Sequence, residues 1–189
     1  FLALSNISNI LRQVAVYAIM AVGMTFVIIT SGIDLSVGAM VPVVSIVVAK
    51  ILNVGPEYLW LALIGGIIAG ILVGLINGLL IAYVGIPPFI MTMGSMKVLN
   101  GFALLVTNSS AVKVTDTTFR FIGTGEILGI PFPIWLVAIV AIASHFVLIK
   151  TPIGRHVFAI GCNREAARLS GVKVKKTLIF VHVFSSICA

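Results

Sequence analysis

The feature that most constrains this sequence is the length of the segments that contain no charged residue. Residues 13–33, 58–96 and 127–149 contain no Asp, Glu, Lys or Arg, and they are 21, 39 and 23 residues long. A helix that crosses the hydrocarbon core of a bilayer needs roughly 20 mostly apolar residues. These segments are therefore long enough for several crossings, and we predict an all-α, polytopic transmembrane helix bundle.

The composition excludes several other classes of protein. Of the 189 residues, 60% are hydrophobic and only 9% are charged, whereas about a quarter of an average soluble domain is charged. This balance excludes an ordinary water-soluble fold, a disordered chain and a nucleic-acid-binding module. Two cysteines are too few for a disulfide framework. The sequence contains no phosphate-binding glycine loop, no Ser-His-Asp arrangement and no metal-ligand spacing, so we expect no catalytic residues and no metal site.

The positive charge is concentrated in one segment and predicts the orientation of the chain. The net charge is +7, and residues 150–176 contain seven basic residues and one acidic residue, which gives +6 for this segment alone. Loops rich in Lys and Arg stay on the cytosolic side of a membrane. We therefore expect residues 150–176 to form a cytosolic loop. By alternation, the connection 107–133 and the N-terminus lie outside.

The apolar periodicity and the turn residues predict five complete or nearly complete helical passes and the start of a sixth. The predicted helices cover residues 10–30, 39–52, 58–84, 89–106, 134–149 and 177–189. The second helix is short and follows the sequence SGIDLSVG, which predicts a discontinuous segment of the kind that builds binding sites in transporters. We expect Asp34 to cap this helix by accepting hydrogen bonds from its first N–H groups. A place in a pathway or gate is the alternative for Asp34.

Four glycines lie four residues apart in the third helix, at positions 66, 70, 74 and 78. This spacing makes a flat stripe that lets another helix approach closely, so it predicts tight helix packing. A sliding surface in a gated bundle is the alternative. We expect Asn77, beside the last glycine, to donate or accept hydrogen bonds across the seam.

Lys97 lies about nine residues into the fourth helix, near the predicted midplane of the bilayer. Burying an ammonium group there is costly, so Lys97 should face the bundle interior or a wet cavity. It would then line a pathway, form an internal ion pair or snorkel to the interface.

The basic segment has helix signals of its own. Asn163 is a good N-cap residue, Glu165 lies in the first turn and Gly171 suits the position after the last turn. These signals predict a helix of about two turns in the cytosol, with a solvated basic connector as the alternative.

Four motifs occur in an order that resembles one family of membrane proteins. They are GMTFVIITSGIDLSVG at 23–38, GLING at 74–78, PFIMTMG at 88–94 and TPIGRHVFAIGCNREAARLSGV at 151–172. They resemble the ribose/xylose/arabinose/galactoside permeases of ABC transporters, and the ribose-type permease is the most similar.

The resemblance implies a function, partners and site residues. The chain would be the permease subunit of an ATP-driven importer that carries a monosaccharide such as ribose across the inner membrane of a bacterium. Its partners would be an ATPase subunit that binds ATP-Mg, an extracytoplasmic sugar-binding protein and a second permease subunit. The chain itself would have no enzymatic activity and would bind no cofactor, because the ATPase activity would belong to the separate subunit. It would be a single domain over residues 1–189, truncated at both ends, that forms the central part of a permease.

The short cytosolic helix would then be the coupling helix that docks on the ATPase. The residues expected to couple to the ATPase are Gly154, Arg155, Gly161, Asn163, Glu165, Ala166, Arg168, Ser170 and Gly171. The residues expected near the substrate pathway are Asp34, Asn77, Phe89, Thr92, Ser95, Lys97 and Asn100.

Three alternatives to this function stay open at the level of the sequence. An ABC permease could carry another solute, such as a nucleoside, an autoinducer or a branched-chain amino acid. Discontinuous helices and a midplane lysine also suit a secondary transporter or channel. In a membrane scaffold that transports nothing, the glycine stripe would serve packing alone.

Overall fold

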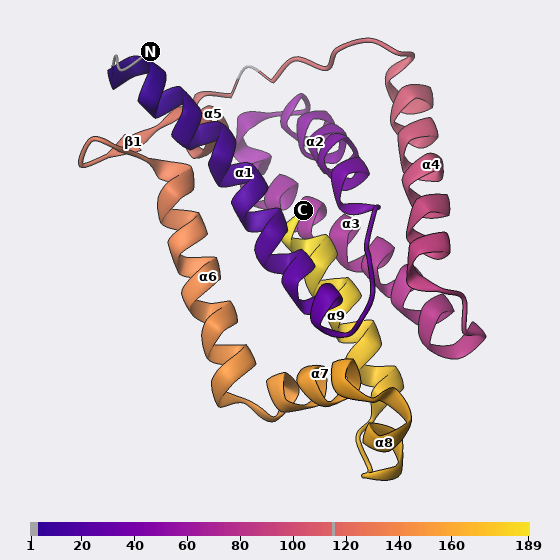
Figure 1. Cartoon of the computed structure of the whole chain (residues 1–189). Coiled ribbons are helices and arrows are strands. Elements are labelled where there is room, and N and C mark those ends of the chain that lie inside the picture. Colours follow the sequence, from indigo (N-terminus) through magenta and orange to yellow (C-terminus); the bar gives the residue numbers. More distant parts are fainter. Residues whose placement is uncertain (1–3, 115) are drawn as a thin grey trace.

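Helices dominate the computed structural model, which describes residues 4–114 and 116–189 (Figure 1). The α-helices are α1 (Leu4–Ile29), α2 (Val37–Leu52), α3 (Leu59–Leu79), α4 (Pro88–Thr107), α5 (Thr117–Thr124), α6 (Phe132–Lys150), α7 (Pro152–Cys162), α8 (Arg164–Leu169) and α9 (Val174–Cys188). A 3-10 turn, Pro56–Tyr58, precedes α3, and a π-helical turn, Leu80–Val84, follows it. The predicted all-α class is confirmed.

Four helical segments of the described chain are long and apolar enough to cross a membrane. They are Asn6–Ile29, Pro56–Val84, Pro88–Thr107 and Phe132–Lys150. α2 is also apolar but has only 16 residues, which makes it about 24 Å long. It is therefore shorter than a full crossing, as the sequence predicts.

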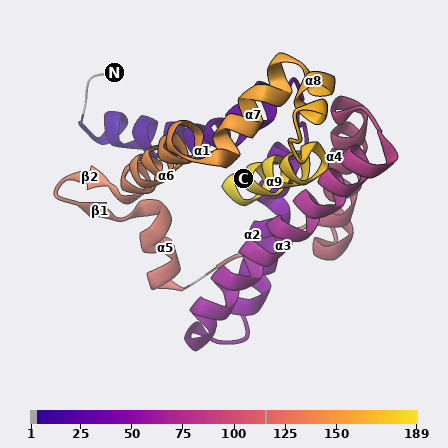
Figure 2. The ribbon, with the colours of Figure 1, turned by 90° about the horizontal axis from the view of Figure 1, so that it is seen from below.

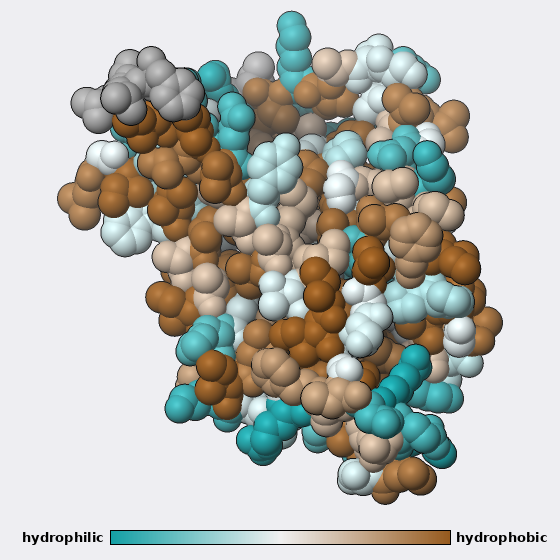
Figure 3. All heavy atoms as spheres, viewed as in Figure 1, coloured by the Kyte–Doolittle hydropathy of each residue, from teal (hydrophilic) through white to brown (hydrophobic). Residues whose placement is uncertain are grey.

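The two ends of the bundle differ in what they carry (Figure 1). The start of α1, α5 and a small hairpin lie at one end, and α7, α8 and the turn between α3 and α4 lie at the other. Apolar side chains fill most of the middle of the face in Figure 3, and hydrophilic side chains lie toward both ends. This distribution is typical of a helix bundle that spans a membrane.

The connection between α4 and α6 has more structure than the polar loop that the sequence predicts. It contains α5 and a hairpin of β1 (Glu126–Ile127) and β2 (Ile130–Pro131). Asp116 caps α5 by accepting a hydrogen bond from the Phe119 N–H at 2.6 Å. Arg12 of α1 forms an ion pair with Glu126 at 2.7 Å, so the hairpin is tied to the bundle.

α9 lies between α1 and α3 and forms the centre of the bundle (Figures 1 and 2). Three glycines of the stripe allow α3 to approach it. A Cβ atom at Gly74 would lie 2.6 Å from the Val183 Cα atom, and one at Gly78 would lie 2.7 Å from the Ile179 Cα atom. Any side chain at these positions would force the helices apart, so the predicted tight packing is confirmed.

The prediction of a loop over residues 150–176 is wrong for its first half, because residues 152–162 form α7. Thr151 caps α7 by accepting a hydrogen bond from the Gly154 N–H at 3.4 Å, and Pro152 occupies the first turn. Val157 and Ile160 are buried against the bundle, so tertiary packing stabilises this amphipathic helix.

The second half of the basic segment folds as predicted. Asn163 caps α8 by accepting a hydrogen bond from the Ala166 N–H at 2.9 Å. Gly171 has a φ of +83°, a left-handed conformation that suits glycine and follows the end of the helix. α9 then begins at Val174, three residues earlier than the predicted sixth helix.

Candidate functional site

A chain of buried hydrogen bonds connects three separate parts of the bundle. Asp34 Oδ1 accepts hydrogen bonds from the Ser36 N–H at 2.9 Å and from the Ser36 hydroxyl at 2.5 Å. Asn77 Nδ2 of α3 donates to Ser36 Oγ at 3.1 Å, and the Ser95 hydroxyl of α4 donates to Asn77 Oδ1 at 2.5 Å. Asp34, Ser36 and Asn77 are 0% exposed. We call this set the polar chain (Asp34, Ser36, Asn77 and Ser95).

The segment that contains Asp34 is irregular backbone, and Thr92 holds it in place. The Leu35 N–H donates to Thr92 Oγ1 at 3.1 Å, and the same hydroxyl lies 2.8 Å from the Pro88 carbonyl oxygen. Irregular backbone at membrane depth needs partners of this kind, because no water or lipid supplies them there. Thr92 therefore links the α1–α2 connector (residues 30–36) to the start of α4.

The predicted capping role of Asp34 is wrong in its detail. Asp34 bonds to the backbone two residues ahead, at Ser36, which is itself the N-cap residue of α2. A short Asp side chain readily closes such a local turn with its own chain. Asp34 therefore shapes the connector rather than the first turn of α2.

Four buried polar atoms near this region have no hydrogen-bond partner within the described part of the chain. They are Asp34 Oδ2, His182 Nε2, Ser185 Oγ and Ser186 Oγ. The other ring nitrogen, His182 Nδ1, lies 2.8 Å from the Leu178 carbonyl oxygen of the same helix. These α9 residues could not be singled out from the sequence, because a single polar residue in an apolar helix carries no signal of its neighbours.

The structure separates the remaining predicted pathway residues from the polar chain. Phe89, Lys97 and Asn100 are exposed on the surface of α4. α4 packs on α2 through Leu99 and Ala103. Residues on the opposite side of α4 therefore point away from the rest of the protein. Lys97 therefore does not face the interior of the bundle, and the predicted alternative, a place beside a wet cavity, stays a prediction. No salt bridge to Lys97 is found within residues 4–114 and 116–189.

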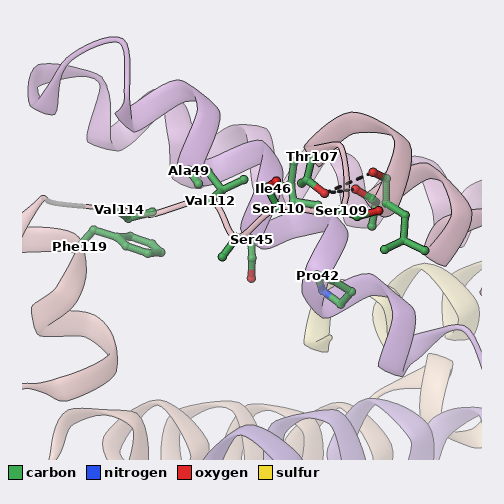
Figure 4. A pocket seen from close by; sticks show the side chains of 13 residues that line it. Pro42, Ser45, Ile46, Ala49, Thr107, Ser109, Ser110, Val112, Val114 and Phe119 are labelled. Atoms are coloured by element: carbon green, nitrogen blue, oxygen red, sulfur yellow. Dashed lines mark hydrogen bonds between the residues drawn. The ribbon is translucent and has the colours of Figure 1, made fainter.

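Two cavities lie beside α4, at different heights. A cavity of about 380 Å³ between α3 and α4 is lined by Asn77 and Ser95 among apolar side chains, and no charged residue lines it. A second cavity, of about 450 Å³, lies between α2, the end of α4 and the connection that follows (Figure 4). Thr107, Ser109 and Ser110 lie together on one side of it. Both cavities therefore combine apolar walls with a few neutral hydrogen-bonding groups.

α7 is held against the bundle at both of its ends by glycine. A Cβ atom at Gly154 would overlap the Leu148 carbonyl oxygen of α6, and one at Gly161 would overlap the Ile29 carbonyl oxygen of α1. Gly154 and Gly161 thus fix the position of α7 rather than present a surface to a partner. The other predicted coupling residues are exposed: Arg155, Asn163, Glu165, Ala166, Arg168, Ser170 and Gly171.

α8 presents charged and apolar groups to the outside. Arg168 Nε donates to Glu165 Oε2 at 3.0 Å. This hydrogen bond, helped by the opposite charge, lowers the pKa of Glu165 and raises the pKa of Arg168. Leu169 lies next to this pair and is 75% exposed.

The chain is similar to known permeases over nearly its whole length. Residues 6–189 match the family described as "Branched-chain amino acid transport system / permease component". The ribose import permease RbsC of Haemophilus influenzae is 40% identical over 190 residues, which cover 98% of this chain and 58% of the relative.

Two further relatives carry related descriptions. RbsC of Bacillus subtilis is 42% identical over 96% of this chain and 57% of its own length. The D-allose transport system permease protein AlsC of Escherichia coli is 34% identical over 100% of this chain and 58% of its own length.

These matches confirm the predicted resemblance to sugar permeases. The chain spans less than two thirds of the length of these curated relatives. No solved structure matches it. We conclude that the chain belongs to this family of transport-system permease components, and that it is a multi-pass protein of the bacterial inner membrane.

Proposed function

We propose that the chain is part of the permease subunit of an ATP-driven importer for a monosaccharide such as ribose. The ATP would be bound and hydrolysed by a separate ATPase subunit, and this chain would bind no cofactor. An extracytoplasmic sugar-binding protein would deliver the sugar, and a second permease subunit would complete the pathway in the membrane. The similarity to ribose and allose permeases supports this choice of solute.

The observation that carries the proposal is the α7–α8 unit at the basic end of the bundle. α7 packs through Val157 and Ile160, and α8 leaves Leu169 and Arg168 exposed. A helix of six residues is too short to be stable alone in water. Its rigid attachment to α7 and α9 therefore suits a docking element that transmits force from a partner.

The cavity between α3 and α4 supports a neutral solute. A sugar needs hydrogen-bonding groups and apolar faces, and Asn77 and Ser95 supply the former among apolar walls. We propose that Asn77, Thr92 and Ser95 act near the pathway from within the bundle. Phe89, Lys97 and Asn100 would reach it from the exposed face of α4, where a second subunit would pack.

The central experiment measures ATP-driven uptake of labelled ribose by membrane vesicles that contain the full-length permease, its ATPase and the binding protein. We expect uptake with ATP and none with a non-hydrolysable analogue. Leu169→Asp should reduce both co-purification of the ATPase and uptake, because it places a charge in the proposed contact. Leu128→Asp is the matched control, since Leu128 is 88% exposed at the other end of the molecule. Uptake that continues without ATP would favour a secondary transporter and contradict the proposal.

The orientation can be tested separately through Cys162, which is exposed, while Cys188 is buried. An impermeant thiol reagent added to intact cells should leave Cys162 unmodified and should label it after permeabilisation. The control is Leu128→Cys in a Cys162→Ser background, which should be labelled in intact cells. Labelling of Cys162 from outside would invert the topology.

The family description favours a branched-chain amino acid as the second candidate solute. An amino acid carries two charges, and no charged side chain lines the α3–α4 cavity, so the geometry suits a sugar better. Competition of ribose uptake by excess leucine distinguishes the two, and inhibition by leucine would favour the second candidate.

A further inference from the structure

Two polar side chains lie at membrane depth on the exposed face of α1. Gln13 and Tyr17 are four residues apart, so they lie on the same face of the helix. Both are exposed, and both belong to the segment of α1 that is apolar enough to cross a membrane. α1 is about 39 Å long, and Tyr17 is near its middle. A polar side chain that faces lipid at this depth is costly, so this face requires a polar partner or a wet cavity.

A cavity between α1 and the start of α2 receives both side chains. Its volume is about 460 Å³, and Gln13, Tyr17 and Met20 of α1 line it together with Gly38 and Pro42 of α2. A second cavity of about 360 Å³ shares Tyr17, Met20 and Gly38 with it, so the two form one groove. Ligand pockets typically have volumes of about 300–1,000 Å³. We call this feature the α1–α2 groove (Gln13, Tyr17, Met20, Gly38 and Pro42).

The start of α2 supplies a backbone acceptor and open space to the groove. Pro42 lies inside α2 and has no N–H group, so the Gly38 carbonyl oxygen lacks the hydrogen bond that the residue four positions later gives in an α-helix. A Cβ atom at Gly38 would meet nothing within 4 Å. Both residues line the groove, so this side of α2 offers a hydrogen-bond acceptor without a side chain in front of it.

We propose that the α1–α2 groove binds the transported solute, and that this solute is a neutral polyol of the size of a monosaccharide. The inference rests on the proposed function as an importer permease. Each hydroxyl of a polyol donates and accepts hydrogen bonds. The Gln13 amide and the Tyr17 hydroxyl also do both, and the Gly38 carbonyl oxygen accepts. The Tyr17 ring and Met20 supply apolar surface for the C–H groups of a sugar ring. No charged residue of the described chain lines the groove, so it offers no counter-charge to an ion.

The polar chain fixes the part of α2 that lines the groove. The α1–α2 connector turns back from the end of α1, so that α2 begins beside the middle of α1 (Figure 1). Ser36, at the end of the connector, accepts a hydrogen bond from Asn77, and Gly38 follows two residues later. Asn77 also lines the α3–α4 cavity. The polar chain therefore joins two solute positions, one on each side of the connector, and the groove adds α1 and α2 to the proposed pathway.

The first test fills the groove through Gly38. The side chain of Gly38→Leu would enter open space, so it should block the groove without disturbing the packing of α2. In the full-length permease assembled with its ATPase and binding protein, ATP-driven ribose uptake should fall about tenfold, because the solute loses its site. Co-purification of the ATPase should not change. Gly101→Leu is the matched control, since a Cβ atom there also meets nothing within 4 Å and Gly101 does not line the groove. Its uptake should equal that of the wild type.

The second test detects the solute beside Tyr17. Tyr17→Cys is introduced into a Cys162→Ser background, in which the other cysteine of this chain, Cys188, is buried. A water-soluble thiol reagent should modify the new cysteine, as followed by the mass of the labelled peptide. Excess ribose should slow this reaction about fivefold, and excess leucine should not, because the groove suits a neutral polyol. Leu128→Cys in the same background is the control, since Leu128 is 88% exposed on the hairpin and should react at the same rate with and without ribose.

Wild-type uptake in Gly38→Leu, or a reaction of Tyr17→Cys that ribose does not slow, would overturn the groove as a solute site. A Tyr17→Cys thiol that does not react would also overturn it, because protein or lipid would then cover this face. Protection by leucine but not by ribose would overturn the polyol as the ligand. If Gly38→Leu does not assemble, the Tyr17→Cys measurement decides alone. Absence of ATP-driven ribose uptake in the wild-type complex identifies a failure of the proposed function instead.

Discussion

The two sides of α3 show two different ways of packing a helix inside a membrane protein. Toward α9, α3 presents glycines, and the contact is between the two backbones. On this side, His182 Nε2 and Ser186 Oγ have no hydrogen-bond partner among the described residues. Toward α4 and the connector, α3 presents Asn77, whose amide is bonded on both sides. Directional hydrogen bonds hold α3 to α4 and the connector through a few polar atoms, whereas α3 is held to α9 by the close fit of two backbones. The first kind of contact is therefore sensitive to the loss of a polar group, and the second is sensitive to added side-chain volume.

The largest expected effect is from filling the glycine surface. Gly74→Val should destabilise the folded chain by about 3 kcal/mol, because the new side chain would collide with the backbone of α9 at Val183. The melting temperature of the detergent-solubilised protein measures this effect. Gly101→Val is the matched control on α4, since a Cβ atom there meets nothing within 4 Å. Equal melting temperatures for the two variants would mean that the α3–α9 contact is looser than described.

Breaking the hydrogen bonds of Asn77 should have the next largest effect. Asn77→Leu removes the donor to Ser36 and the acceptor for Ser95, and we expect a loss of about 2 kcal/mol, since buried groups are left without partners. Asn77→Asp keeps an acceptor for Ser95 and tests which of the two bonds matters more. An unchanged melting temperature for Asn77→Leu would contradict the view that the polar chain holds α3 to α4.

Substitutions on the exposed α8 should separate stability from assembly. Arg168→Glu should lower the melting temperature only slightly, because the Glu165–Arg168 pair that it breaks is exposed. It should nevertheless reduce co-purification of the ATPase and ATP-driven uptake together. Lys113→Glu makes the same change in charge at the opposite end of the bundle and should affect neither. Full assembly and uptake in Arg168→Glu would argue against α8 as the coupling helix.

The smallest expected effect is the pH dependence of the Glu165–Arg168 pair. The pKa of Glu165 is lowered from its ordinary value of 4.5, first by the hydrogen bond from Arg168. The stabilisation is therefore fully present above pH 4.5 and is lost as the pH falls through the lowered folded value. Glu165→Gln should cost slightly more stability at pH 7 than at pH 3, as measured by thermal unfolding. A larger cost at pH 3 would contradict this sign.

Much of the fold could be predicted because its signals are local. Charge-free segments set the spanning helices, and the capping residue Asn163 and the stop at Gly171 predicted α8. α7 was missed although Thr151 and Pro152 are start signals, because the basic charge of the segment suggested a loop. The hairpin at 126–131 was missed because strands of two residues leave no pattern.

The candidate site could be predicted only in part. Asp34, Asn77 and Ser95 belong to motifs or to the polar part of α4, and the structure brings them together. Ser36 was not singled out, and His182 is one polar residue in an apolar run. No rule of spacing connects Ser36 to Asn77, since they are far apart in the sequence. Lys97 was expected near the pathway but is exposed on α4. Hydropathy predicts the depth of a residue in the membrane but not the side of the helix on which it lies.

The sequence by itself determined that the chain enters a membrane, which segments are apolar enough to cross it and which end carries the positive charge, because burial in lipid depends on the composition of each segment alone. Only the tertiary structure decided which faces meet: α9 packs against the glycines of α3 and against Gly23 and Phe26 of α1, and Asp34 is joined to Asn77 through Ser36. These facts depend on the relative rotation of helices, and rotation is set by the summed packing of all contacting side chains rather than by any one segment.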